Sequence, residues 1–233
     1  MANPEHVQLV KQGVEAFTRW RQENPNAALD LERADLPGIN LVGARIRNAN
    51  LEGANLTDAR LGRASLSKAN LADADLTGAD LGRANVTDAN CAGTNFTNAN
   101  LYWSDFRGSN LAGAVLHYAR AMRASFLNAN LSGADASQAT MIEVDLRNAN
   151  LKGANFSAAN MNGADISRAA LAGANFTKAM IRDSLWIMTD MRRANLDMAS
   201  LHRSDLNLAK YDETTRFPKN FDPENTGARD VVD

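Results

Sequence analysis

The 233-residue chain contains a single cysteine, Cys91. One cysteine excludes an internal disulfide and any zinc site built on cysteines. There are only three histidines, His6, His117 and His202, and their spacing assembles neither a metal cluster nor a nucleophile–base pair. Serines and threonines are expected at surface corners without a partner base. The sequence therefore predicts no enzyme, no cofactor and no metal site.

Long apolar runs and an excess of one charge are also missing. No segment approaches the roughly 18 consecutive apolar residues of a membrane span, and the first residues lack the basic-then-apolar order of a signal peptide. The 25 basic and 27 acidic residues give a formal net charge of −2. This balance disfavours a nucleic-acid partner. We expect a cytoplasmic protein without a membrane partner.

Aromatic residues make up only 6% of the chain, which argues against a core of large side chains. A five-residue repeat is present instead. Residues whose numbers end in 1 or 6, from 31 to 211, form 37 repeat centres, of which 32 are Leu, Ile, Val, Met or Phe. Two residues before the centres from 36 to 211, 28 of the 36 positions are Ala. The residue between them is often Asn or Asp.

Neither a helix nor a flat strand accommodates this period. Five helical residues advance about 140° beyond a full turn, which would scatter the centres around the helix. In a strand, residues five apart point to opposite faces. The pattern fits a short extended piece whose Ala and centre both point inward, followed by a two-residue corner. Four such sides close a coil of twenty residues. The expected core is typified by five centres: Leu56, Leu76, Phe96, Phe156 and Phe176.

The second corner position often carries glycine, as at Gly53, Gly93 and Gly113. Glycine there suits the positive φ of a type II turn. The stretch ANLEGANLTDARL and its continuation resemble the pentapeptide-repeat proteins. This resemblance covers residues 31–211 and implies an all-β fold, a right-handed quadrilateral parallel β-helix of about nine coils. We predict a helical cap over residues 1–28, the β-helix over 29–211, and a capping segment with a loose tail over 212–233.

Both flanks are similar to those of bacterial, often cyanobacterial, pentapeptide-repeat proteins, which carry W-R-x-x-N-P before the repeats and Y-D-x-x-T-x-F-P-x-x-F-D-P after them. The first motif comprises Trp20, Arg21, Asn24 and Pro25 here, and the second begins at Tyr211. Members of this subgroup mostly lack assigned functions.

The residues before the repeats predict one amphipathic helix that ends at Asn24–Pro25. Its apolar face is formed by Val7, Val10, Val14, Phe17 and Trp20. A solenoid needs caps on its end coils, so we interpret this helix as the N-terminal cap. The alternative is a helix that binds a membrane or a partner.

After the repeats, four residues are candidates for a C-terminal cap: Tyr211, Phe217, Pro218 and Phe221. The chain from about Glu224 is polar and expected to be loose. Apolar residues also gather on the outside near this end: Leu185, Ile187, Met188, Met198 and Leu208. Either the Phe217–Phe221 tail covers them, which we favour, or a second chain does. A monomer and a C-terminal homodimer are thus both open.

Surface charge differs between adjacent sides of the predicted coil. The second side, with centres such as Leu56 and Leu76, carries five acidic residues and one basic residue. The third side, with centres such as Leu61 and Leu81, carries seven arginines and three acidic residues. At its corner, positions twenty apart form a column next to Tyr102: Arg63, Arg83, Trp103 and Arg123. These are either tolerated corner residues or a partner-binding face, since aromatic residues and arginine are favoured in interface hot spots.

Two functions follow. The first is a non-catalytic interaction scaffold that binds another protein, of unknown identity, through flat β-helix faces. The second comes from the resemblance, because the best-known pentapeptide-repeat proteins mimic DNA, bind DNA gyrase and confer fluoroquinolone resistance. Those proteins present strongly acidic surfaces, whereas the repeats here are charge-balanced. A threonine ladder for ice binding begins at Thr57, Thr77 and Thr97 but is broken at His117.

The predicted fold has a simple spectroscopic signature. The far-ultraviolet circular dichroism spectrum should be dominated by β structure, with a minor helical component from the N-terminal cap. A mainly helical spectrum would contradict the β-helix.

Overall fold

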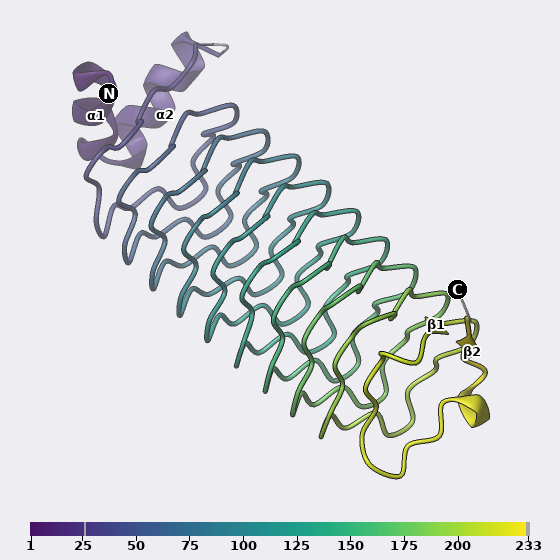
Figure 1. Cartoon of the computed structure of the whole chain (residues 1–233). Coiled ribbons are helices and arrows are strands. Elements are labelled where there is room, and N and C mark those ends of the chain that lie inside the picture. Colours follow the sequence, from purple (N-terminus) through teal and green to yellow (C-terminus); the bar gives the residue numbers. More distant parts are fainter. Residues whose placement is uncertain (26, 232–233) are drawn as a thin grey trace.

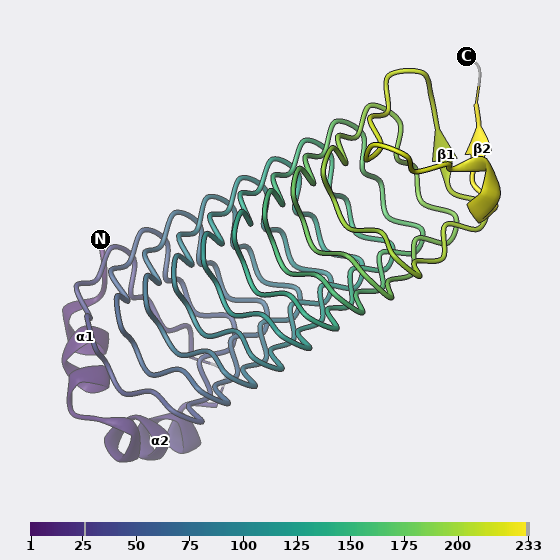
Figure 2. The same cartoon turned by 90° about the horizontal axis from the view of Figure 1, so that it is seen from below.

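A computed structural model describes residues 1–25 and 27–231. Between residues 30 and 210 the chain winds into coils of twenty residues that stack along one axis (Figures 1 and 2). Each residue that precedes a centre forms a parallel bridge with the residue twenty positions later, from Asp30–Asn50 to Asp190–Lys210. The five-residue register predicted from the sequence is therefore kept over this whole range.

The interior is filled by the two inward side chains of each side. Ala54 and Leu56, two residues apart, are both fully buried. The five residues predicted to typify the core, Leu56, Leu76, Phe96, Phe156 and Phe176, are all 0% exposed. Aromatic centres stack along the axis, with ring centroids 5.1 Å apart for Phe156 and Phe176. Trp186, which is also fully buried, donates its indole N–H to Ser184 Oγ at 2.7 Å.

Every corner between residues 33 and 208 has the same backbone form. The inward alanine closes the turn through its N–H, as from Ala54 to the Leu51 carbonyl at 3.0 Å. The second corner residue always has a positive φ, as the type II prediction requires. Glycine occupies only 11 of these 36 positions, although a left-handed conformation costs other residues about 1–2 kcal/mol. Ladder hydrogen bonds of the next coil offset this cost.

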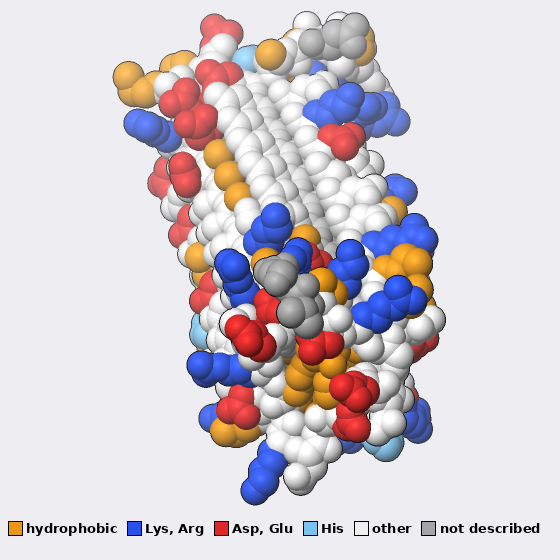
Figure 3. Space-filling model, turned by 45° about the vertical axis from the view of Figure 1, so that its right-hand side comes forward, with side chains coloured by type: hydrophobic (Ala, Val, Ile, Leu, Met, Phe, Trp, Pro, Cys, Tyr) orange, Lys and Arg blue, Asp and Glu red, His pale blue; other side chains and the backbone are white. Residues whose placement is uncertain are grey.

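Asparagine and aspartate before the centres stabilise the corners. Their side-chain oxygen accepts the N–H two residues later, as from Thr77 to Asp75 Oδ1 at 3.0 Å. On the first side, with centres such as Leu71 and Cys91, consecutive coils are also linked by side-chain amides at 2.9–3.4 Å, in the order Asn50, Asn70, Asn90, Asn110, Asn130 and Asn150. Figure 3 shows an uncharged band that runs along the rod between rows of charged side chains.

The N-terminal cap consists of two helices, α1 (Pro4–Lys11) and α2 (Val14–Glu23), so the prediction of one helix is wrong. Gly13 separates them because its φ of 98° lies outside the helical range and is readily adopted only by glycine. Both helices lie at the N-terminal end of the rod (Figure 2). Val10 and Phe17 are fully buried, and the remaining predicted cap residues are partly buried against the core: Val7, Val14 and Trp20.

The C-terminal segment adds a partial coil over the last complete one. The ring of Phe217 contacts Tyr211 and Phe221, with centroid distances of 5.4 Å to each, and Pro218 beside it is half-buried. Arg216 bridges to Asn195, which shifts the twenty-residue register by one. Phe217 and Phe221 are partly buried and pack against the core.

The prediction of a loose tail from about Glu224 is wrong for the residues described. A short 3₁₀ helix, η1 (Glu224–Thr226), leads into β2 (Arg229–Asp230), which pairs in parallel with β1 (Lys210–Tyr211). Arg229 N–H donates to the Ala209 carbonyl at 2.7 Å. The last coil offers unpaired backbone groups at its edge, and these hydrogen bonds satisfy part of them. Residues 232–233 lie outside the described range.

The tail does not cover the outward apolar residues near this end, contrary to the interpretation that we favour from the sequence. Leu185, Met188 and Met198 are 41%, 48% and 60% exposed, while Ile187 and Leu208 are half-buried. The aromatic tail residues instead lie over the open end of the rod, because the inward side chains of the final coil present the larger apolar surface there.

The role of α2 as a cap can be tested by substitution of its buried and exposed residues. Replacing Phe17 with Ala should lower the free energy of unfolding by about 3–5 kcal/mol, because a fully buried ring is lost. Replacing Arg19, which is exposed on the same helix, with Ala should stay within about 0.5 kcal/mol. Urea titration followed by circular dichroism measures both. Equal stability of the two variants would show that α2 does not cap the core.

Candidate protein-binding face

The predicted patch lies on the third face, which we define as the side with centres Leu61, Leu81 and Leu101. Its outward side chains come from the residue before each centre and the two corner residues after it. Arg63, Arg83, Trp103 and Arg123 occupy second corner positions twenty residues apart, and Tyr102 is a first corner residue. The structure thus aligns the predicted residues along one edge of the face.

Two exposed aromatic rings are at the centre of the patch. Tyr102 and Trp103 are 36% and 48% exposed, and their rings meet edge to face at 6.1 Å. Arg123 places its guanidinium carbon 5.4 Å from the Trp103 ring centroid. Its Nε–H donates to Glu143 Oε2 at 2.5 Å. The hydrogen bond and charge of Glu143 raise the pKa of Arg123, and Arg123 lowers the pKa of Glu143.

Arg63 and Arg83 differ from Arg123 in having no partner. Both side chains are exposed, and neither forms a hydrogen bond or an ion pair with any residue in the described part of the chain. They lie one ladder step apart, where like charges repel. Setting aside the pairs Arg123–Glu143 and Arg203–Asp183, five arginines and one aspartate remain on the third face: Arg60, Arg63, Arg83, Arg120, Arg182 and Asp80. The face is thus basic.

The structure adds residues to the predicted patch. The predicted Tyr102 lines a shallow hollow of about 330 Å³ on the same face, together with Asn100, Arg120, Met122 and Thr140. Tyr118, 47% exposed, lies at the opposite edge with its ring 4.0 Å from that of His117. The signal was present, because residues 118–123 form one side of one coil. The sequence comparison followed positions twenty apart along the rod and did not compare neighbouring positions across the face, so Tyr118 was not selected.

The backbone at Trp103 has the left-handed form that every corner of the β-helix shares. Its φ is 57°, in the left-handed region. Bulky residues are rarely found there. Tyr118 and Leu208 adopt the same conformation at their corners, so the backbone by itself does not distinguish Trp103. What distinguishes Trp103 is a large apolar ring that is 48% exposed.

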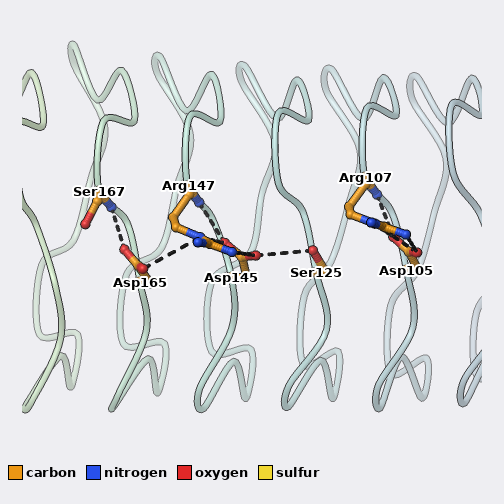
Figure 4. Close-up of polar contacts among 7 residues, drawn as sticks. All are labelled: Asp105, Arg107, Ser125, Asp145, Arg147, Asp165 and Ser167. Carbon is orange, nitrogen blue, oxygen red and sulfur yellow. Dashed lines mark hydrogen bonds and ion pairs between the residues drawn. The ribbon is translucent and has the colours of Figure 1, made fainter.

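The fourth face, with centres such as Phe106 and Phe126, pairs its charges in the middle of the rod with one another. Arg107 binds Asp105 through Nε and Nη2, at distances down to 2.6 Å, and Arg147 binds Asp145 in the same manner at 2.9 Å. Figure 4 shows that these pairs lie along one row, which continues to Asp165. Burial opposes ionisation of Asp145, but its hydrogen bonds with Arg147 outweigh this and lower its pKa. These side chains are less available to a partner than those of the third face.

The expectation that no serine has a partner base is wrong. His117 Nδ1 and Ser137 Oγ lie 2.8 Å apart, because both occupy first corner positions exactly one coil apart. Ser137 is only 7% exposed, which shields its hydroxyl from a substrate. Among the described residues, no three histidine, cysteine or acidic side chains are grouped as for a metal ion. Nor is any described helix long and apolar enough to span a membrane.

A family comparison agrees with this architecture. The family model for pentapeptide repeats matches in eight copies, over residues 29–63, 54–90, 74–113, 109–148 and 141–177. No curated protein sequence matches the chain significantly. The repeat match covers more than half of the chain and coincides with the coils described above.

Solved structures of other proteins share the fold. HetL, a pentapeptide repeat protein involved in heterocyst differentiation regulation from the cyanobacterium Nostoc sp. strain PCC 7120, is similar with a TM-score of 0.64 and 23% identity, over 91% of this chain and 90% of that chain. Full-length QnrB1, a plasmid-mediated fluoroquinolone resistance protein, has a TM-score of 0.62 and 16% identity, over 88% of this chain and 94% of that chain. The predicted quadrilateral β-helix is thereby confirmed.

Because Trp103 has a left-handed backbone, its replacement by glycine is expected not to destabilise the protein. Replacing Trp103 with Gly should leave the free energy of unfolding unchanged or raise it by up to about 1 kcal/mol, because relief of the backbone strain offsets the lost cation–π contact. The reverse change is available at Gly113, where φ is 66° and an added Cβ would meet nothing within 4 Å. Gly113→Ala should therefore lower stability by about 1 kcal/mol. A large loss on Trp103→Gly would assign Trp103 a structural role.

Proposed function

Because the chain belongs to the pentapeptide-repeat family, whose right-handed quadrilateral β-helix it adopts, we propose that it is a non-catalytic cytoplasmic scaffold that binds another protein through the third face. The proposal rests on Trp103, a half-exposed indole whose ring contacts Tyr102 and the Arg123 guanidinium. Tryptophan, tyrosine and arginine are the residues most enriched in interface hot spots, and all three occur together here.

The arrangement supports recognition of an extended, acidic protein surface. Arg123 is held against Trp103 and Glu143, so part of the patch is ordered before a partner arrives. Preorganisation of this kind lowers the entropic cost of association. Arg63 and Arg83 extend the patch along the rod with unpaired positive charge. A partner with acidic side chains at the coil spacing would satisfy them, and attraction between opposite charges would speed association.

The second candidate is a DNA-mimicking modulator of DNA gyrase. QnrB1 has a similar fold over 88% of this chain, which is the reason to consider this function. At 16% identity, however, the similarity supports the fold alone. The acidic second face would have to play the part of DNA: Asp35, Asp58, Asp75, Asp135 and Asp197. The nearly equal numbers of basic and acidic residues count against it.

Affinity capture with variants of each face tests the proposal. Purified wild type, Trp103→Gly and Arg63→Glu/Arg83→Glu would be immobilised and exposed to lysate of the source organism, with quantitative mass spectrometry of the retained proteins. The partner should be retained by the wild type and lost from both variants. With purified partner, Trp103→Gly should weaken the affinity by at least about 30-fold, the equivalent of a 2 kcal/mol hot spot. Arg123 is not varied, because its replacement by Glu would break the pair with Glu143.

The matched control is Asp58→Lys/Asp197→Lys on the second face, since both side chains are exposed. This variant should retain the partner. Loss of the partner from this control alone, together with inhibition of gyrase supercoiling by the wild type, would overturn the third-face proposal and support the DNA mimic.

A further inference from the structure

Arg21 is a buried cation at the junction between the cap and the first coil. Its side chain lies in α2 and the residue is only 9% exposed. The guanidinium lies 4.8 Å from the Trp20 ring centroid. Nη1 donates to the carbonyls of Asn24 at 3.2 Å and Ala27 at 2.7 Å. These bonds hold the chain that leaves the helix, and burial lowers the pKa of the guanidinium.

The other edge of the Arg21 guanidinium has no partner. Nε and Nη2 are both buried and form no hydrogen bond among the described residues. Arg107, Arg147 and Arg192 use this same Nε–Nη2 edge to bind a carboxylate. No carboxylate is paired with Arg21 within the described chain. A buried charge without its counterion is costly, so this edge points to a missing anion.

Two adjoining cavities share Arg21, Pro25 and Arg45 in their walls. The first, of about 470 Å³, is also lined by Arg47. The second, of about 530 Å³, is also lined by Phe17 and by other residues of α2. None of the residues that line either cavity is acidic. Arg45 and Arg47 are exposed, and Arg47 Nε donates to Ser67 Oγ at 3.0 Å. Three arginines thus line the first cavity, and no described acidic residue belongs to its wall.

We propose that this junction is a binding site for a phosphate group, with Arg45 and Arg47 as its outer ligands and the Nε–Nη2 edge of Arg21 as its inner ligand. Nε and Nη2 of Arg21 each expose less than 1 Å². An anion therefore reaches them only when the cavity wall moves. Binding there would neutralise the buried charge and fasten the cap to the first coil. The site lies at the N-terminal end of the rod, beside the corner at Gly43 that belongs to the third face. It involves none of the residues of the patch around Trp103 and is independent of the function proposed above.

The number of arginines favours a phosphate over a single carboxylate. A phosphate monoester carries about −1.5 to −2 charges at neutral pH and has three strong acceptor oxygens. The arginine fork matches two oxygens of such a group. The cavities also exceed the volume of a bare anion, which leaves room for the body of an ester. Inorganic phosphate and a small phosphate ester are thus two sources of the same recognised group.

Isothermal titration of the full chain tests the site with three probes at matched ionic strength: inorganic phosphate, glucose 6-phosphate and citrate. Saturable 1:1 binding of at least one of the two phosphates is expected, with a rise in the thermal midpoint that sodium chloride does not reproduce. Tighter binding of glucose 6-phosphate would identify an ester as the ligand, and equal binding would identify the free anion. Binding of citrate alone would overturn the assignment of phosphate.

Two sets of variants locate the binding. Arg45→Gln/Arg47→Gln changes exposed side chains and should weaken phosphate binding at least tenfold. The control Arg60→Gln/Arg168→Gln removes the same charge from exposed positions elsewhere and should bind as the wild type does. Arg21→Lys keeps the charge but removes the fork and should also weaken binding. If it does not fold, the exposed pair still decides. Unchanged affinity of Arg45→Gln/Arg47→Gln, or equal loss in the control, would refute the site.

Discussion

The narrow interior of the coil is the constraint on which the rest of the structure depends. Each side admits one larger side chain and, two residues earlier, one small side chain, as Leu56 and Ala54 illustrate. To return to the interior after five residues, the chain must turn sharply, and the second corner residue takes a positive φ at every corner from 33 to 208. Parallel ladder hydrogen bonds between coils then hold a backbone form that most side chains disfavour.

This constraint separates folding from function. Inward positions are restricted in size, while the corner and ladder positions are free to vary on the outside. Adjacent faces of one rod consequently differ: the first carries an asparagine ladder, the fourth pairs charges with one another in the middle of the rod, and the third leaves Arg63, Arg83 and Trp103 available. The two ends differ from the repeats, because they close the core with elements that do not follow the five-residue period. The proposed phosphate site lies at the junction between the N-terminal cap and the first coil.

The sequence was sufficient to predict the β-helix, its register and its inward residues, because a five-residue period has few structural solutions. The sequence was not sufficient to predict the two ends, because the end segments occur only once and have no periodicity to interpret. Gly13 reads as an interruption that helices tolerate, and only its φ of 98° shows that it divides the cap. Pairings across coils, such as His117 with Ser137 and Arg123 with Glu143, require positions twenty apart to be compared in three dimensions. The unpaired edge of Arg21 has no counterpart in sequence.

Site-specific photo-cross-linking can show whether the third face contacts a partner. A photoreactive phenylalanine derivative would replace Trp103 or, as control, Asp73, an exposed residue with φ of 55° on the diagonally opposite corner column. We predict a covalent adduct with the partner from position 103 and none from position 73. An adduct from position 73 without one from position 103 would contradict the account.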